Sequence, residues 1–553
     1  MTHATVKIMK HALRLRSRRL GILAWAIAAL CALPMGAVAL AALTGGADTL
    51  SQLVATVLPQ YIGTTVVLGA IVAVGTGVIG TGTAWLVTAT IFPGRRIFEI
   101  ILALPLAFPA YVLAYAYTDF LDHPGWVQST LRGITGWGPR DYWFPEIRSL
   151  GGAAAMLTLV LYPYVYLLAR AAFLQQSATA HIAARTLGHK PWRTFLRISL
   201  PIARPAIAGG VLLALMETLA DFGTVSYFGV QTFATGIYQS WFSFFDRAAA
   251  AQLALCLLMI ALMLAVAERA QRRNHRHHGA GRRFEALPPA RLTRIQAAWA
   301  MIACGMPVIF GFILPTGLLL SMGWGSGQIL FSPRYGAFLQ NSLTLATIAA
   351  IITVMAAIAL GFNARLHPTR PAQTAIRLAS LGYAVPGGVI AVGLLVPFAA
   401  FDTLLDTIME ATFAIDTGLF ITGSIWVLVM AYIVRFLAAA LNAYDAGLAT
   451  INPNMDVVAR TLGRTPNTIL RGVHLPILRP SILTAFLIVF VDVMKELPAT
   501  LIMRPFNFDT LAIQAHRLAA DERLSEAAVP SLVIGGVGLI PVIILCWRLG
   551  RKN

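Results

Sequence analysis

Long apolar runs recur along the whole chain and restrict it to one class of fold. A run of about 20 apolar residues crosses the hydrocarbon core of a bilayer as an α-helix, and only helices and closed barrels satisfy the backbone there. The chain is 58% hydrophobic and 12% charged, against roughly 45–50% and about 25% in soluble domains. We therefore predict an all-α integral membrane protein with about twelve transmembrane helices, at 20–43, 62–92, 98–118, 150–173, 203–222, 248–267, 297–321, 341–361, 375–400, 418–441, 481–501 and 529–547.

The basic residues predict the orientation of these helices. Arginine and lysine gather at the amino terminus, in residues 269–296 and at the carboxyl end, whereas the loop 402–416 carries only acidic charges. Twelve spans with a cytoplasmic amino terminus place all three basic clusters on the cytoplasmic side, as the positive-inside rule requires. We expect a multi-pass protein in the lipid bilayer with both termini cytoplasmic. The net charge of +19 is explained as a topological signal, so no nucleic acid partner is expected.

The first apolar run could also be a cleaved signal peptide, because it contains small residues near residue 37. It is longer than the apolar core of a signal peptide, and similar runs follow it. We expect a retained first helix. The four cysteines all lie in predicted spans, so neither a disulfide framework nor a stable metal site is predicted.

One polar segment occurs twice. ARTLGHKPWRTFLRISLPIARPAI at 184–207 returns as ARTLGRTPNTILRGVHLPILRPSI at 459–482, an offset of 275 residues, and FPAYVLA at 108–114 pairs with VPGGVIA at 385–391. An even number of helices in each half makes the halves parallel repeats. We predict a first transmembrane domain at 1–268, a basic cytoplasmic linker at 269–296 and a second transmembrane domain at 297–553.

Each copy of the segment is predicted to form two short helices around a glycine. Pro191 and Pro466 suit a first helical turn, with Thr465 as an N-cap. The Leu-Pro pairs at 200–201 and 475–476 are expected to end each short helix, because a residue before proline disfavours helical geometry. An interfacial helix that binds only lipid headgroups would look similar. Two matched copies on one face instead indicate a partner with two-fold symmetry.

These segments resemble the cytoplasmic coupling loop of ABC importer permeases, the EAA loop, in which a Leu-Pro lies thirteen residues beyond a glycine. The resemblance implies the type I importer permease fold and a loop that docks on the ATPase subunit. Ile182 and Val457 stand where the family has a glutamate, each preceded by a polar residue, His181 or Asp456. The coupling residues implied are Ala184, Arg185, Thr186, Leu187, Gly188 and Pro201, and Ala459, Arg460, Thr461, Leu462, Gly463 and Pro476.

Two further stretches narrow the resemblance. ETLADFGTVSYFGV at 217–230 and DVMKELPATLIMRPFNFDTLA at 492–512 are similar to the two halves of fused permeases of ferric iron importers. That family implies a bacterial inner membrane and a periplasmic substrate-binding protein as a partner. Permeases for thiamine, polyamines and oxyanions share parts of the second stretch.

Charged residues in these stretches are candidates for the substrate pathway. Glu217 and Asp221 are spaced i, i+4, and Asp492 and Glu496 stand at the same 275-residue offset. Charges in membrane spans are costly and often functional, and carboxylate oxygen suits a hard cation. We expect these four carboxylates to contact the substrate transiently, with Lys495 neutralising one of them. The alternative is that they pair with one another or cap helix ends.

No energy-converting motif is present. A Walker A loop needs GxxxxGK[ST], and none of the five lysines lies in one. The chain is therefore expected not to be an enzyme and to hold no cofactor, with ATP and Mg²⁺ bound by a separate homodimeric ABC ATPase on the cytoplasmic side.

The combined expectation is a permease subunit that moves ferric iron inward by alternating access. An importer for thiamine, polyamine or another small solute is the alternative within this class. An ion-gradient-driven secondary transporter is the alternative from another class, but it would not need two matched docking loops.

Overall fold

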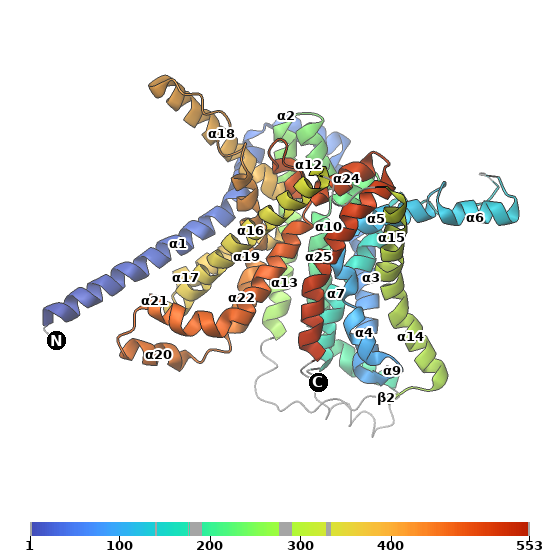
Figure 1. The fold of residues 1–553 in the computed structure, drawn as a ribbon, viewed down its shortest axis with the longest axis horizontal. Coiled ribbons are helices and arrows are strands. Elements are labelled where there is room, and N and C mark those ends of the chain that lie inside the picture. The colour runs from blue at the N-terminus through green and yellow to red at the C-terminus, as the bar shows by residue number, and fades with distance from the viewer. Residues whose placement is uncertain are drawn as a thin grey trace. The chain divides into compact units, whose positions relative to one another are not determined.

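Helices form almost all of the chain in the computed structural model, which describes residues 3–138, 141–174, 176, 191–275, 290–327 and 333–550. Within those residues, eleven helical spans are long and apolar enough to cross a bilayer, and a bent pair at 95–135 raises the number to as many as twelve. The predicted all-α membrane fold is confirmed (Figure 1).

The helices form two compact units. Unit 1 consists of Met1–Gly46, Asp246–Leu258 and Gly336–Thr510, and unit 2 of Ala47–Phe245, Met259–Tyr335 and Leu511–Asn553. Each unit therefore takes segments from both predicted repeats. The sequence boundaries at 268 and 297 stay a prediction about the repeat, and they differ from the division into compact units. Residues 276–289 of the predicted linker lie outside the described residues.

Unit 1 is built around packed helices from both ends of its sequence. Helix α1 packs along α17 and α18, and α19 packs against α22. Its elements are α1 (His3–Thr44), the start of α13 (Arg247–His275), α16 (Pro333–Leu366), α17 (Arg370–Ala379), η4 (Gly382–Ala384), α18 (Gly387–Phe413), α19 (Ile425–Leu448), α20 (Pro453–Thr461), α21 (Pro466–Ile469), η5 (Leu470–His474), α22 (Leu475–Met494) and α23 (Pro498–Met503).

Unit 2 is centred on α3, α7 and α10, which pack against one another. A Cβ atom on Gly80 of α3 would lie 2.6 Å from Cβ of Val165 in α7, so glycine permits this close crossing. The elements are α2 (Ala47–Thr56), α3 (Leu58–Ala89), β1 (Thr90–Ile91), α4 (Arg95–Ile101), η1 (Leu104–Ala107), α5 (Ala110–Leu121), α6 (Trp126–Thr135), α7 (Leu150–Leu174), α9 (Pro191–Thr194), η2 (Phe195–Ser199), α10 (Leu200–Ala220), α11 (Gly223–Tyr227), α12 (Phe233–Phe242), the rest of α13, β2 (Ala290–Arg291), α14 (Arg294–Val308), η3 (Ile309–Ile313), α15 (Leu314–Gly325), α24 (Leu511–Ala520) and α25 (Leu524–Gly550).

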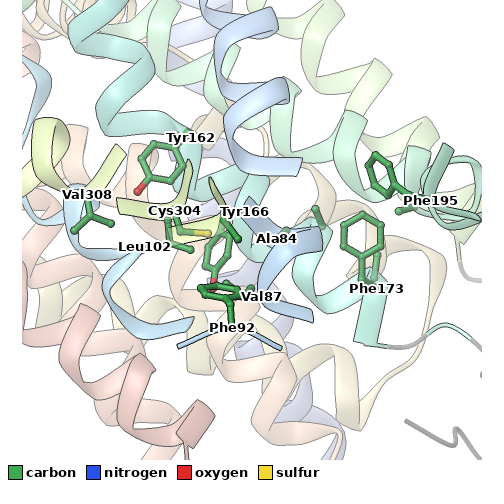
Figure 2. Packing of buried hydrophobic residues seen from close by; sticks show 14 of the residues in the cluster. Ala84, Val87, Phe92, Leu102, Tyr162, Tyr166, Phe173, Phe195, Cys304 and Val308 are labelled. Atoms are coloured by element: carbon green, nitrogen blue, oxygen red, sulfur yellow. The ribbon is translucent and has the colours of Figure 1, made fainter. Parts of the chain in front are cut away.

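The buried core of unit 2 joins segments that are far apart in the sequence. Tyr162 and Tyr166 of α7 are fully buried, and Cys304 and Val308 of α14 pack in the same cluster (Figure 2). The two-residue strands β1 and β2 pair in parallel beside it, with Thr90 opposite Ala290. Helix α14, which the sequence assigns to the second repeat, thus completes a core made chiefly by the first.

Two predicted spans are broken by proline at matching places. The run at 98–118 consists of α4 and η1 followed by α5, and the run at 375–400 consists of α17 and η4 followed by α18. Pro109 and Pro386 are the extended N-cap residues of α5 and α18. The prediction of single uninterrupted helices is wrong here, because a residue before proline is disfavoured in helical geometry.

The predicted outer loop at 402–416 is also wrong in its boundaries, because α18 extends to Phe413. Two of its acidic residues instead accept hydrogen bonds from the backbone of residues 417–422, which follow α18. Asp402 accepts hydrogen bonds from the backbone N–H groups of Ile421 and Thr422, and Asp406 accepts one from Thr417.

Candidate coupling segment and buried carboxylates

The second copy of the repeated segment forms α20, α21, η5 and α22 in succession (Figure 1). Asn452 caps α20 by accepting from the N–H of Asn454, and Pro453 occupies the first turn. The helix ends before Gly463, whose φ of +73° lies in the left-handed region that favours glycine. Thr465 then caps α21 by accepting from Thr468. The first predicted short helix, the glycine turn and the Thr465 cap are confirmed in this copy. The second predicted helix is not short, because α21, η5 and α22 form one continuous span over Pro466–Met494.

Helix α20 turns a charged face toward the body of unit 1. Oδ2 of Asp456 lies 2.8 Å from Nε of Arg365 at the end of α16, and Oδ1 lies 2.6 Å from Nε2 of His474 in η5. Arg460, one turn further along α20, donates to the carbonyl oxygen of Leu366. We call Asp456, Arg365 and His474 the coupling-helix triad, because these three side chains connect α20 to both neighbouring helices.

The coupling-helix triad is almost excluded from solvent. His474 is fully buried, Asp456 is 6% exposed, and the ring of Phe362 packs edge-on against His474 at 5.3 Å. Burial alone raises the pKa of Asp456, but the hydrogen bonds from His474 and Arg365 outweigh it, so the pKa lies below its usual value. The Asp456 carboxylate is therefore ionised and accepts hydrogen bonds from two side chains, which fixes α20 in place.

The opposite face of α20 is apolar and exposed. Met455, Val458 and Leu462 follow one another at i, i+3 and i+7, and Leu462 is 73% exposed. Val457, where the related loops have a glutamate, is also exposed. We call Met455, Val458 and Leu462 the α20 apolar stripe. An amphipathic helix normally buries its apolar side, so this reversed arrangement leaves an apolar surface available to another protein.

The predicted break at each Leu-Pro is wrong. A five-residue π-helical turn precedes it in both copies, at Phe195–Ser199 and at Leu470–His474, and the helix continues without interruption through Pro201 and Pro476. A π turn adds one residue to a helical turn, which accommodates a proline that lacks an N–H and crowds the preceding carbonyl. The same arrangement precedes Pro315, with η3 at Ile309–Ile313.

The first copy of the repeated segment is described from Pro191 onward. Ala184, Arg185, Thr186, Leu187 and Gly188 lie outside the described residues. Pro201 lies at the start of α10. In η2, Phe195 is buried and its ring lies 4.8 Å from that of Trp85 in α3. The described end of this copy is therefore anchored by aromatic packing.

Two of the four candidate pathway carboxylates act as helix caps. Asp221 accepts hydrogen bonds from the N–H groups of Thr224 and Val225 and from the Thr224 hydroxyl, at the start of α11. Glu496 accepts the same three kinds of hydrogen bond from Ala499 and Thr500, at the start of α23. The 275-residue repeat therefore reproduces a structural motif, not only a spacing.

Glu496 is also surrounded by polar groups. Its carboxylate lies 3.8 Å from Nη1 of Arg435 in α19 and is 1% exposed. The hydroxyl of Tyr432 lies 2.5 Å from the Thr500 hydroxyl that donates to Glu496. A buried carboxylate in this setting is held by a cation and by several donors, as buried charges require.

Asp492 and Lys495 differ from these caps in their exposure. Oδ1 of Asp492 lies 2.9 Å from Nζ of Lys495, and both side chains are about one quarter exposed. This is the pairing that the sequence predicted for Lys495. Glu217 is half-buried on α10. Because Glu217 and Asp221 lie in unit 2 and the other pair in unit 1, the convergence of all four carboxylates stays a prediction.

Sequence reasoning missed a second charged cluster, in unit 2. Arg148 forms a bidentate ion pair with Glu522, with nitrogen–oxygen distances of 2.6 and 2.8 Å, and a second ion pair with Asp122. Its guanidinium also lies over the Tyr227 ring, 5.2 Å from the centroid. No spacing could reveal a contact between residues 374 positions apart. Arg365 and His474 of the coupling-helix triad were missed for the same reason.

Among the described residues, no three His, Cys, Asp or Glu side chains gather as a candidate metal-binding group. Nothing in this part of the chain therefore suggests a resident metal ion. The predicted transient role of Glu217, Asp221, Asp492 and Glu496 toward a cation is untested by this observation, because a transported ion needs no permanent ligand set.

Known proteins resemble this chain over most of its length. Residues 89–277 match the family described as binding-protein-dependent transport system inner membrane component. An Fe(3+)-transport system permease protein of Haemophilus influenzae is 27% identical over 500 residues, covering 88% of this chain and 90% of the relative. A ferric transport system permease protein of Actinobacillus pleuropneumoniae is 24% identical over 76% of this chain and 62% of the relative.

A molybdenum transport system permease protein of Escherichia coli matches a shorter part. It is 30% identical over 148 residues, which cover 26% of this chain and 60% of the relative. The predicted resemblance is confirmed by these matches, and the two relatives described above that extend over most of the chain are named for ferric transport, whereas a probable ABC transporter permease of Sinorhizobium fredii, 23% identical over 79% of this chain, is named for no substrate.

Proposed function

This chain is a binding-protein-dependent transport permease of the ABC importer family, and from that premise we propose how it works and with which partners. It carries ferric iron across the bacterial inner membrane. The observation that supports this most directly is the similarity to an Fe(3+)-transport permease across 88% of the chain and 90% of the relative. Hard carboxylate ligands suit Fe³⁺ as a substrate. Among the candidate pathway residues Glu217, Asp221, Asp492 and Glu496, Asp492 is partly exposed and can meet a passing ion, whereas Asp221 and Glu496 are engaged as helix caps.

The energy for transport comes from a separate subunit in this proposal. A homodimeric ABC ATPase binds ATP and Mg²⁺ on the cytoplasmic side and contacts both copies of the repeated segment, while a periplasmic binding protein delivers the substrate on the other side. Both termini of the permease are cytoplasmic. The exposed α20 apolar stripe supports the ATPase contact, because it offers an apolar surface for docking. Val457 stands where the related loops have a glutamate, so the contact rests on apolar packing and not on that charge.

The structure supports a mechanical role for the coupling-helix triad. Force applied to α20 passes through Asp456 to α16 by way of Arg365 and to η5 and α22 by way of His474. Since α22 carries Asp492, ends at Met494 and leads directly to Lys495 and Glu496, a displacement of α20 passes along one continuous helix to these three candidate pathway residues. Alternating access follows if the two repeats rock about a common axis.

Copurification tests the partner assignment. The tagged permease is expressed together with the ATPase and binding-protein genes that neighbour its own, solubilised in mild detergent and isolated. We expect an ATPase at two copies per permease. Isolation of a permease that carries no ATPase and still accumulates ferric iron on a proton gradient would favour a secondary transporter instead.

The choice of substrate needs a separate measurement. The isolated binding protein is titrated with Fe³⁺ in a weak chelator and, in parallel, with thiamine, a polyamine, molybdate and sulfate. We expect binding of Fe³⁺ alone. Selective binding of thiamine or a polyamine would retain the importer mechanism and change its substrate.

A further inference from the structure

A groove runs between α16 and α22 in unit 1, beginning where the coupling segment enters the membrane. Its volume is about 610 Å³, within the size range of small-molecule sites. Two arginines stand toward one end, and apolar side chains line the rest. The lining residues that matter for the argument are Arg471, Arg479, Ile351, Met355, Leu483 and Phe486.

The two arginines are available to an anion. Both are exposed, and within the described residues neither has a carboxylate partner. They are eight positions apart, or about 12 Å along a helix axis. Side chains on a helix lean toward its amino-terminal end, so both arginines lean the same way along the helix, and their long side chains place two positive charges along one part of the groove.

The remainder of the groove suits a hydrocarbon chain. Ile351 and Met355 on α16 and Leu483 on α22 are 47%, 59% and 58% exposed, and with Phe486 they form an apolar strip that continues away from the arginines. A ligand that fits must therefore carry a negative charge at one end and a long apolar chain at the other.

We propose that this groove binds one anionic phospholipid, with its headgroup held by Arg471 and Arg479 and an acyl chain along Met355, Leu483 and Phe486. The charge complementarity commits the site to an anionic headgroup. With the cytoplasmic orientation of the coupling segment proposed above, the lipid comes from the inner leaflet. Arg471 lies in η5, three residues before His474 of the coupling-helix triad, so the bound lipid stabilises the segment through which the ATPase acts.

Native mass spectrometry of the purified permease in mild detergent tests the site. Phosphatidylglycerol and phosphatidylcholine of equal chain length are titrated separately, and the first lipid bound is quantified. The double substitution Arg471→Gln with Arg479→Gln should weaken the first phosphatidylglycerol site roughly 25-fold, from about a fivefold contribution per arginine, and leave phosphatidylcholine unchanged. Arg370→Gln with Arg377→Gln is the matched control, since it removes two exposed arginines from α17 outside the groove.

A second variant tests the apolar part of the groove. Leu483→Trp fills the strip, so it should reduce binding of both lipids while the arginines remain, and gel filtration shows whether each variant is folded. A double arginine variant that prefers phosphatidylglycerol as strongly as the control pair does would overturn the proposal, as would undiminished lipid binding in Leu483→Trp. None of these readouts depends on iron transport or on an ATPase, so their failure is distinct from failure of the proposed function.

Discussion

At the scale of single residues, the candidate pathway carboxylates fall into two groups, those that are buried as helix caps and those that are partly exposed. Asp221 and Glu496 each accept three hydrogen bonds from the start of a following short helix. Asp492 is instead partly exposed and paired with Lys495. The buried caps hold local structure, whereas the exposed pair can exchange partners with a passing ion at lower cost.

Substitution separates these two roles. Glu496→Gln keeps the shape but loses the negative acceptor, and loss of a helix cap costs about 1–2 kcal/mol; it should lower the thermal unfolding midpoint of the purified permease. Asp492→Asn should leave that midpoint nearly unchanged, because a partly exposed ion pair contributes about 0–1 kcal/mol, and should reduce the rate of iron uptake. An Asp492→Asn permease with unchanged uptake kinetics would assign Asp492 to structure.

His516 on α24 makes the stability of unit 2 dependent on pH. Burial lowers the pKa of this imidazole to about 4, and its Nδ1 lies 3.0 Å from the Tyr115 hydroxyl. The unfolded chain binds the proton near pH 6.5 and the folded chain only near pH 4, so the contribution is complete above pH 6.5 and falls as the pH drops. The shift corresponds to about 3 kcal/mol.

Thermal unfolding between pH 7 and pH 4.5 measures this dependence. The wild-type permease should lose stability as the pH falls, and His516→Gln should have a shallower slope. His123→Gln, which changes an exposed histidine in the same unit, serves as the control with the wild-type slope. Equal slopes in all three proteins would show that His516 is not the titrating group.

At the scale of helices, the coupling segment reverses the usual arrangement of an amphipathic helix. The coupling-helix triad lies on the side of α20 that faces unit 1, and the α20 apolar stripe faces outward. The sequence correctly predicted the short helix before Gly463, the glycine turn and the Thr465 cap, because each depends on local chemistry. It missed the triad and the π turns, because these arise from contacts between distant segments and from the strain that proline imposes on a continuing helix.

Disruption of the α20 apolar stripe should affect docking and not folding. Val458→Asp with Leu462→Asp places two charges on an exposed surface, so the free energy of unfolding should stay within about 0.5 kcal/mol of wild type. Copurification of the ATPase should be lost. Asn454→Asp, which adds one charge to an exposed position of the same helix, should retain the ATPase, and a stripe variant that also retains it would refute the docking surface.

Disruption of the coupling-helix triad, in contrast, should lower the stability of the permease. Asp456→Asn removes the charge that pairs with Arg365 and His474, and breaking a buried ion pair costs roughly 3–5 kcal/mol when a charged partner is left behind. The unfolding midpoint should fall clearly, with faster proteolysis of the segment 450–474. Asn454→Ala is the matched control on the exposed side. A stable Asp456→Asn variant would mean that the triad does not hold α20.

At the scale of the whole molecule, the repeat in the sequence and the compact units differ. Helix α1 packs in unit 1 with α17 and α18, and α14 completes the core of unit 2 beside Tyr162 and Tyr166. Apolar runs predicted the number of helices, since membrane thickness dictates their length. They could not predict this exchange of helices, because every apolar run satisfies the bilayer equally well and only side-chain packing selects its neighbours.

The central claim is ATP-driven import of ferric iron, and reconstituted transport tests it most directly. The permease, its copurified ATPase and the binding protein are placed in proteoliposomes, and uptake of radioactive Fe³⁺ is followed with ATP at the cytoplasmic face. Uptake should require ATP, the loaded binding protein and an intact α20 apolar stripe, and should persist when proton and sodium gradients are collapsed. Iron uptake that continues without ATP and stops when those gradients collapse would contradict the claim.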